Sequence, residues 1–257
     1  PYRQLVTQLE DDLHNRIDTE HDLAADLKAA WQESRDKDRS ADSLSEWRDA
    51  YCTQIAVAWV LTTIFARFLE DNALLDETHL ASAAAGTRAN RVDDNYRFYF
   101  REHPTDSDTD YLLAVFARLA ALPAGEVFSE KRNALYRMRI SGDAGRDLLA
   151  FFRAIDPDTG RLAHTFHTES GDTRFLGDLY QDLSEDARKR YALLQTPEFV
   201  EEFILDHTLQ PAIDTFGLDE VRFIDPTCGS GHFLLGGFRS ILDQKLAAHP
   251  GKNRTIL

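Results

Sequence analysis

Cysteine is scarce in this chain of 257 residues, which contains only Cys52 and Cys228, far apart in the sequence. Such scarcity excludes a disulfide framework and favours a reducing, cytoplasmic setting. Long hydrophobic runs are scarce as well, because the most apolar run, residues 55–66, is too short to span a bilayer. We therefore expect a soluble globular protein without membrane contact, in which this run forms the central buried helix of a bundle.

Positive charge is also in short supply. The chain has 29 Lys and Arg against 44 Asp and Glu, which gives a formal net charge of −15. Proteins that bind nucleic acid gain affinity by neutralising its phosphates with Lys and Arg. An excess of acidic residues therefore has the wrong sign for a nucleic-acid-binding surface. We expect that the chain does not bind DNA by itself. Its apolar fraction of 43% is nevertheless sufficient for a sizeable core.

Helical periodicity dominates the first two thirds of the chain. Residues 1–34 are predicted to form one polar helix, because Leu5, Leu9, Leu13 and Ile17 share a stripe. A break rich in Ser and Asp over 36–45 precedes a long helix that ends near Asp71. Further helical patterns cover 112–122 and 148–152.

Two clusters in this region have both functional and structural interpretations. Tyr96, Phe98, Tyr99 and Phe100 interleave with two arginines, a pattern that could stack bases, but we favour aromatics that seat one helix on the bundle. His164 and His167 lack a recognised zinc spacing, so we expect no metal there.

A different pattern begins at Val221, where β-favouring apolar residues are followed by Asp225-Pro226-Thr227-Cys228-Gly229-Ser230-Gly231-His232-Phe233-Leu234. It predicts a short buried strand that ends in a carboxylate and turns through two glycines into a helix. Ligands bind at the carboxyl ends of strands in open α/β sheets, and glycines let a ligand approach the main chain. The segment therefore predicts one edge of a nucleotide-type pocket.

Two common phosphate-binding motifs do not fit this segment. A P-loop requires a lysine directly after its second glycine, and none follows Gly231 at that spacing. A dinucleotide fingerprint requires a third glycine at position 234, where the chain has Leu234. An ordinary packing turn between a strand and a helix is the remaining structural alternative.

A second helix start lies about thirty residues upstream of the glycine turn. Thr196 is a natural N-cap, and Pro197 is tolerated at the first helical position because that position has no intrahelical N–H bond to lose. The free N–H groups and the positive end of the helix dipole would attract a carboxylate.

Together, these segments resemble S-adenosylmethionine-dependent amino-methyltransferases that act on DNA. Asp225-Pro226 with Gly229-Ser230-Gly231 and Phe233 resembles their first cofactor motif, and Thr196-Pro197 resembles their Thr-Pro motif. Residues 174–183 and the Arg-Phe-Leu-Glu-Asp string at 67–71 narrow the resemblance to adenine-specific methyltransferases of the phage growth limitation, or BREX, defence systems. This group is related to type I and type IIG restriction-modification enzymes. The resemblance is specific over 174–238 and looser over 1–173.

The resemblance implies a mainly α fold with two parts. An N-terminal helical bundle domain would cover 1–173, and 174–257 would begin a Rossmann-like α/β methyltransferase domain with its first strand-turn-helix. S-adenosylmethionine would be held by Thr196, Pro197, Asp225, Pro226, Cys228, Gly229, Ser230, Gly231 and Phe233. One departure is Gln195, which stands where the family has an aromatic residue.

The implied reaction is methyl transfer from S-adenosylmethionine to adenine N6 in a short DNA site. Neither Pro-Pro-Tyr nor Pro-Pro-Phe occurs in these 257 residues, and the acidic ribose ligand that follows the second strand is not present. We therefore expect an N-terminal fragment of a longer enzyme, without catalytic residues and inactive by itself.

Double-stranded DNA would be bound by the C-terminal part of that enzyme, and other defence proteins or a phage inhibitor are further candidate partners. One alternative is a helical interaction scaffold that docks such proteins. Another is a methyltransferase that acts on RNA or protein.

Overall fold

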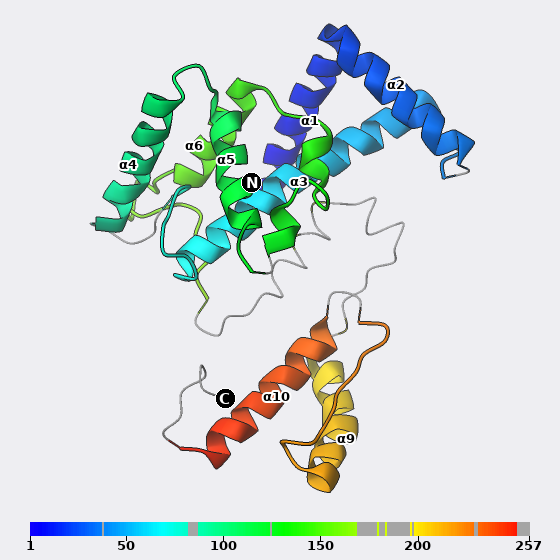
Figure 1. The fold of residues 1–257 in the computed structure, drawn as a ribbon, viewed down its shortest axis with the longest axis vertical. Helices are drawn as coiled ribbons and strands as arrows, with labels where there is room; N and C mark the ends of the chain where they lie inside the picture. The colour runs from blue at the N-terminus through cyan, green and yellow to red at the C-terminus, as the bar shows by residue number, and fades with distance from the viewer. Residues whose placement is uncertain are drawn as a thin grey trace. The chain divides into compact units, whose positions relative to one another are not determined.

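The computed structural model describes residues 1–37, 39–81, 87–123, 125–168, 179, 183, 196, 198–228 and 231–250, with the backbone alone for 87–90 and 198. The chain divides into two compact units, Pro1–Arg190 and Tyr191–Leu257. Both units are built from helices, so the predicted mainly α fold is confirmed (Figure 1). The predicted domain boundary between residues 173 and 174 lies outside the described residues.

The first unit contains six described α-helices and two short 3₁₀ helices, and the second contains two described α-helices. Their bounds are α1 Tyr2–Thr19, α2 His21–Asp36, α3 Leu44–Asp71, α4 Thr87–Glu102, α5 Asp108–Ala120, η1 Gly125–Phe128, η2 Ala134–Arg137, α6 Gly142–Arg153, α9 Glu198–Phe216 and α10 His232–Ala248.

The predicted helix over 1–34 is wrong in one respect, because it is two helices. Glu20 adopts an extended conformation, with φ −104° and ψ 102°, between the end of α1 and the start of α2. The predicted stripe still holds in α1, whose buried residues are Leu5, Val6, Leu9, Leu13 and Ile17. The break allows α2 to run in a different direction from α1, and both helices contact α3.

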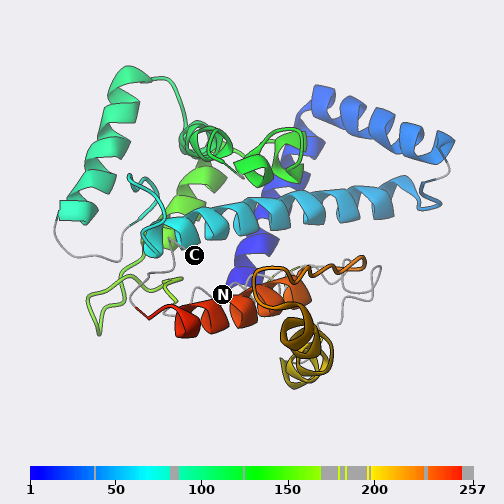
Figure 2. The ribbon, with the colours of Figure 1, turned by 60° about the horizontal axis from the view of Figure 1, so that its bottom comes forward.

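Helix α3 is the central helix of the first unit and crosses α1 (Figure 2). It begins with a capping box, in which the Ser43 hydroxyl accepts the Glu46 N–H and the Glu46 carboxylate accepts the Ser43 N–H. Its buried side chains include Cys52, Ile55, Val57, Trp59, Val60, Ile64 and Phe68. The predicted central buried helix is therefore confirmed.

Helix α3 is longer than the apolar run 55–66, which was expected to be too short to span a bilayer. The helix has 28 residues and a window of mean hydropathy 1.5, so by length and composition it could cross a membrane. That window is 67% buried inside the structure. Core helices pass the same test, and the packing of α3 against α1, α2 and η2 accounts for its apolar surface.

A buried cluster of charges closes the C-terminal end of α3. The Arg67 side chain is fully buried, and its Nη2 lies 2.7 Å from Asp71 Oδ1, while Nη1 lies 3.4 Å from Glu70 Oε2. Nη1 also donates to the Ala81 carbonyl. Burial raises the pKa of Glu70, and the neighbouring backbone N–H groups and Arg67 oppose that rise. The two carboxylates and the guanidinium therefore depend on one another inside the core.

The same cluster ties distant segments to the end of α3. Glu70 accepts backbone N–H groups from His79, Leu80 and Ala81. Asp71 accepts the Phe166 N–H at 2.9 Å, and Asn72 bonds both the Phe166 carbonyl and the Thr168 N–H. Charged residues at one helix end thus satisfy the main chain of two loops that approach from different parts of the sequence.

In the second unit, α9 and α10 run in the same direction. Near their beginnings, a Cβ added to Gly236 would lie 2.0 Å from Glu201 Oε1. Farther along, Gln244 Nε2 donates to Gln210 Oε1 at 2.9 Å. Residues early in α9 therefore lie beside residues early in α10, and later residues lie beside later ones. Both helices begin at the same end of the pair (Figure 1). A small core between them contains Leu205, Leu209, Ile213, Leu218, Val221, Phe223, Phe233 and Ile241.

Residues 221–224 do not form the predicted strand. The segment forms no helix or strand, and the described residues include no strand with which it could form a ladder. Its alternation still places Val221 and Phe223 on the small core and leaves Ile224 81% exposed. The expected buried strand is therefore wrong: Ile224 is exposed, and a strand also requires a hydrogen-bonding neighbour.

Replacing Arg67 with Met should destabilise the first unit by about 3–5 kcal/mol, because Glu70 and Asp71 would remain buried without their cation. Equilibrium urea denaturation would measure the loss. The matched control is Arg101→Met, whose side chain is 69% exposed and which should change stability by no more than about 0.5 kcal/mol. Equal effects of the two substitutions would contradict the role given to the buried cluster.

Replacing Gly236 with Ala should loosen the α9–α10 pair by about 1–3 kcal/mol, since the new Cβ would overlap the Glu201 carboxylate. Hydrogen exchange of the amides in these two helices would report this loss specifically. In a Glu201→Ala background the cost should shrink by about 1 kcal/mol or more. Strictly additive effects would show that the two residues do not meet as described.

Candidate functional site

Both predicted cofactor motifs lie at the shared N-terminal end of α9 and α10. Thr196 is half-buried and stands two residues before α9, and Gly231 directly precedes α10. The chain between these positions forms α9 and returns along it, so residues far apart in the sequence meet at one end of the helix pair. Pro197, Gly229 and Ser230 lie outside the described residues.

The turn after Asp225 is organised by its own side chain. Asp225 Oδ1 accepts the Thr227 N–H at 3.0 Å and lies 3.4 Å from the Thr227 hydroxyl, which is the geometry of an Asx turn. The Gly231 N–H then donates to the Cys228 carbonyl at 2.6 Å. Pro226 and Cys228 are exposed, so this part of the predicted site faces solvent.

Gly231 is the residue whose conformation the turn requires. Its φ of 86° and ψ of 18° place it in the left-handed region, which costs other residues about 1–2 kcal/mol. Within the described part of the chain, no atom lies within 4 Å of the position that a Cβ would take. The glycine is therefore needed for its backbone conformation, and no described side chain fills the space beside it.

The first turn of α10 carries positive potential at this end. The helix contains no acidic residue in its first turn, and its N-cap has no side chain to satisfy the first N–H groups. The beginning of α9 adds a second helix dipole directed the same way. An anionic group such as a carboxylate would be stabilised there.

Sequence analysis missed one residue at this end, Glu201. It is 1% exposed and is the only buried charged side chain among the described residues of the second unit. It stands in the stripe that continues with Leu205, Leu209 and Ile213 at intervals of four residues. A glutamate at a core position of an amphipathic helix was the available signal.

The remaining predicted residues have structural contacts. Phe233 packs against the small core of the second unit, which fixes the first turn of α10. Cys228 is exposed in the turn and forms no disulfide within the described part of the chain.

In the first unit, the aromatic cluster on α4 seats that helix on the core. The rings of Tyr96 and Tyr99 each lie 5.1 Å from the ring of Tyr111 on α5, with edge-on geometry. Phe98 alone of the four predicted aromatics is largely exposed, and Arg101 lies 4.8 Å over its ring. The structural interpretation of this cluster is therefore confirmed.

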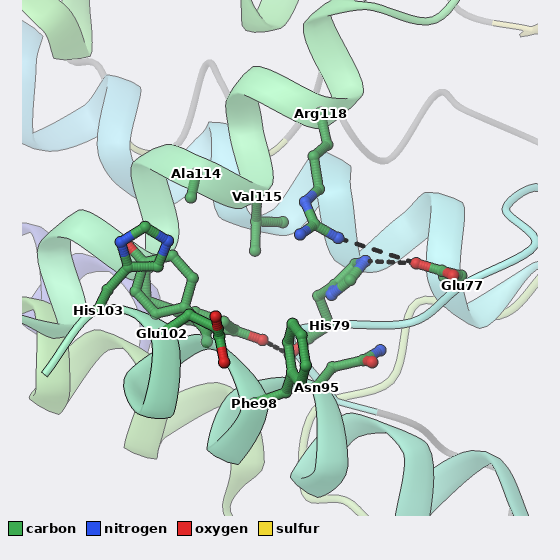
Figure 3. Close-up of a pocket in the computed structure, with 11 residues that line it drawn as sticks. Glu77, His79, Asn95, Phe98, Glu102, His103, Ala114, Val115 and Arg118 are labelled. Carbon is green, nitrogen blue, oxygen red and sulfur yellow. Dashed lines mark hydrogen bonds and ion pairs between the residues drawn. The ribbon is translucent and has the colours of Figure 1, made fainter.

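A cavity of about 460 Å³ lies beside this cluster, between α4, α5 and residues 77–79 (Figure 3). Glu77 Oε2 lies 3.4 Å from His79 Nε2 and 3.8 Å from Arg118 Nη1 on its wall. Burial lowers the pKa of His79, with Arg118 acting in the same direction. These charged groups are satisfied by one another, and no predicted cofactor residue lines the cavity.

The two histidines considered for a metal have other surroundings. Among the described residues, no group of three or more His, Cys, Asp or Glu side chains could hold a metal ion. The ring of His164 stacks on Phe151 with centroids 4.1 Å apart, and burial lowers its pKa. His164 therefore contributes to packing.

No protein-family profile matches the chain, and no solved structure matches it significantly. The chain is, however, 43% identical over 259 aligned residues to the adenine-specific methyltransferase PglX of Streptomyces coelicolor. The alignment covers 98% of this chain and 21% of that protein, so the chain spans about a fifth of the relative's length. The resemblance found in the motifs is confirmed by this match: along nearly all its length, the chain is similar to one part of an adenine-specific methyltransferase.

Proposed function

We propose that this chain is part of a site-specific DNA methyltransferase that transfers a methyl group from S-adenosylmethionine to adenine N6 in a bacterial phage-defence system. Its similarity to PglX supports the reaction class. The proposed role of the second unit is to hold the methionine end of the cofactor. The observation that carries this role is the convergence of Thr196 and the glycine turn at one end of α9 and α10.

The groups at this end fit the cofactor's chemistry. S-adenosylmethionine carries a carboxylate, an ammonium and a sulfonium close together. The two helix beginnings offer N–H groups and dipoles for the carboxylate, and the open space beside Gly231 admits a ligand to the main chain.

The proposed cofactor residues are those predicted from sequence: Thr196, Pro197, Asp225, Pro226, Cys228, Gly229, Ser230, Gly231 and Phe233. In this proposal Asp225 orders the turn, Gly231 gives it the required backbone conformation, and Phe233 anchors it to the core. The bound cofactor would supply the activated methyl group.

We further propose that these 257 residues do not complete the transfer by themselves. They contain no Pro-Pro-Tyr or Pro-Pro-Phe, whose polar and aromatic groups would hold a flipped adenine. Because the net charge is −15, we also propose that another part of the enzyme binds double-stranded DNA. A cytoplasmic location, where DNA and cofactor meet, is part of the proposal.

Calorimetric titration of the chain with S-adenosylmethionine should show saturable binding that Gly231→Ala weakens about tenfold. The alanine would strain a residue at φ 86° by about 1–2 kcal/mol and displace the turn. Gly217→Ala is the matched control. It imposes the same strain at φ 82°, with equally open surroundings, but lies just after the far end of α9.

The two variants should lose similar stability in thermal denaturation, while only Gly231→Ala should lose affinity. Equal affinities would remove the glycine turn from the cofactor site. If the unaltered chain bound no cofactor at millimolar concentration, the alternative of a helical scaffold for defence proteins or a phage inhibitor would be favoured instead.

A further inference from the structure

The cavity beside α4 is a second place in the chain where a ligand could bind (Figure 3). Its volume of about 460 Å³ lies within the range of roughly 300–1,000 Å³ that small-molecule sites occupy. Its walls come from α4, α5 and residues 77–79, all in the first unit. The cavity shares no residue with the proposed cofactor site, so its ligand does not depend on the proposed function.

Hydrogen bonds hold the walls of the cavity together. The Tyr99 hydroxyl of α4 donates to Asp106 Oδ2 at 2.7 Å. Asn95 Nδ2, also on α4, donates to the Thr78 carbonyl at 3.0 Å. The cavity is therefore formed before a ligand arrives, and binding needs little reordering of its walls.

The charges that line the cavity favour a cation. They are two carboxylates and one guanidinium, those of Glu77, Glu102 and Arg118. Glu77 Oε2 and Arg118 Nη1 lie 3.8 Å apart and offset one another. Burial lowers the pKa of His79, so its ring adds no positive charge near neutral pH. Glu102 therefore gives the lining a net negative charge, which attracts a cation and repels an anion.

Phe98 and Glu102 form a cation-holding pair on α4. They stand four residues apart, so they share one face of the helix, and both line the cavity. The Arg101 guanidinium lies 4.8 Å from the centroid of the Phe98 ring, and Arg101 Nε lies 3.4 Å from Glu102 Oε1. Arg101 does not line the cavity. The ring and the carboxylate thus already hold one guanidinium from outside, and they also face the cavity.

The α5 side of the cavity is apolar. Ala114 and Val115 stand across from Phe98 in Figure 3 and offer aliphatic surface. A flat ligand fits between an aromatic ring and such a surface, because both of its faces then have apolar contacts. The Glu102 carboxylate would accept N–H groups at the edge of that ligand.

We propose that this cavity is a binding site for a flat organic cation of the guanidinium or amidinium class. The face of the cation lies on the Phe98 ring, and its N–H groups donate to Glu102. The apolar part of the ligand contacts Ala114 and Val115. A neutral analogue of the same shape keeps the apolar contacts and loses the interactions that need positive charge.

Three probes that share one ring and differ in charge test the site: benzamidine, benzamide and benzoate. Calorimetric titration of the full chain should show saturable binding of benzamidine at millimolar concentration. Benzamide should bind about fivefold more weakly, as expected for the loss of a partly exposed ion pair. Benzoate should show no saturable binding, because Glu102 repels it. Equal affinities for benzamidine and benzamide, or no binding of benzamidine, would overturn the proposal.

Two substitutions locate the binding. Glu102→Gln should weaken benzamidine about fivefold, and Phe98→Leu about threefold. Both side chains are more than half exposed, so both variants should fold. The matched control is Glu126→Gln, which removes a carboxylate that is 80% exposed and does not line the cavity. It should leave the affinity unchanged. Full affinity in both cavity variants would place benzamidine elsewhere and overturn the proposal.

Arginine with an acetylated N-terminus and an amidated C-terminus distinguishes two sources of such a cation. Binding at least as tight as that of benzamidine would identify the natural ligand as an arginine side chain of a protein. Weaker binding would identify it as a free small molecule. Both results support a guanidinium-type site, and its loss in Glu102→Gln should accompany either one.

Discussion

The close approach of α9 and α10 at Gly236 is the constraint on which the candidate site depends. Without a side chain at Gly236, the two helices can begin at the same end with the Glu201 carboxylate between them. Gly237 continues this contact, because its missing side chain leaves room for the ring of Phe223. Gly236 and Gly237 thus allow a close approach between two helices whose beginnings lie far apart in the sequence. The position of the turn at Gly231 relative to α9 depends on this approach.

The first unit uses buried charge for a different purpose. Arg67, Glu70 and Asp71 bind one another and the main chain of two loops, so their charges are balanced within the cluster and hold the end of α3 in place. In the second unit, Glu201 is 1% exposed, and its carboxylate lies against Gly236 of α10. The cluster in the first unit ties loops to a helix end, whereas Glu201 lies between two helices.

Much of the helical fold could be predicted because its information is local. The stripe from Leu5 to Ile17 and the apolar face of α3 repeat at helical spacing, and both are buried as expected. The break at Glu20 could not be predicted from that stripe, since it depends on the packing of α2. The strand expected at Val221 was wrong for a related reason: β-favouring residues are a local signal, but a ladder requires a neighbouring strand that the described residues do not provide.

The residues of the candidate site likewise divide into those that local sequence predicts and those that depend on tertiary packing. The glycine turn and the Thr196 helix start were visible because backbone conformation and capping restrict the residue types that fit. For Glu201 the only local signal is a glutamate within an apolar stripe, because its burial depends on Gly236 of another helix. Motifs therefore locate where a ligand's main-chain contacts can form. The burial of Glu201, by contrast, comes from tertiary packing, because it depends on the close approach of α9 and α10 at Gly236.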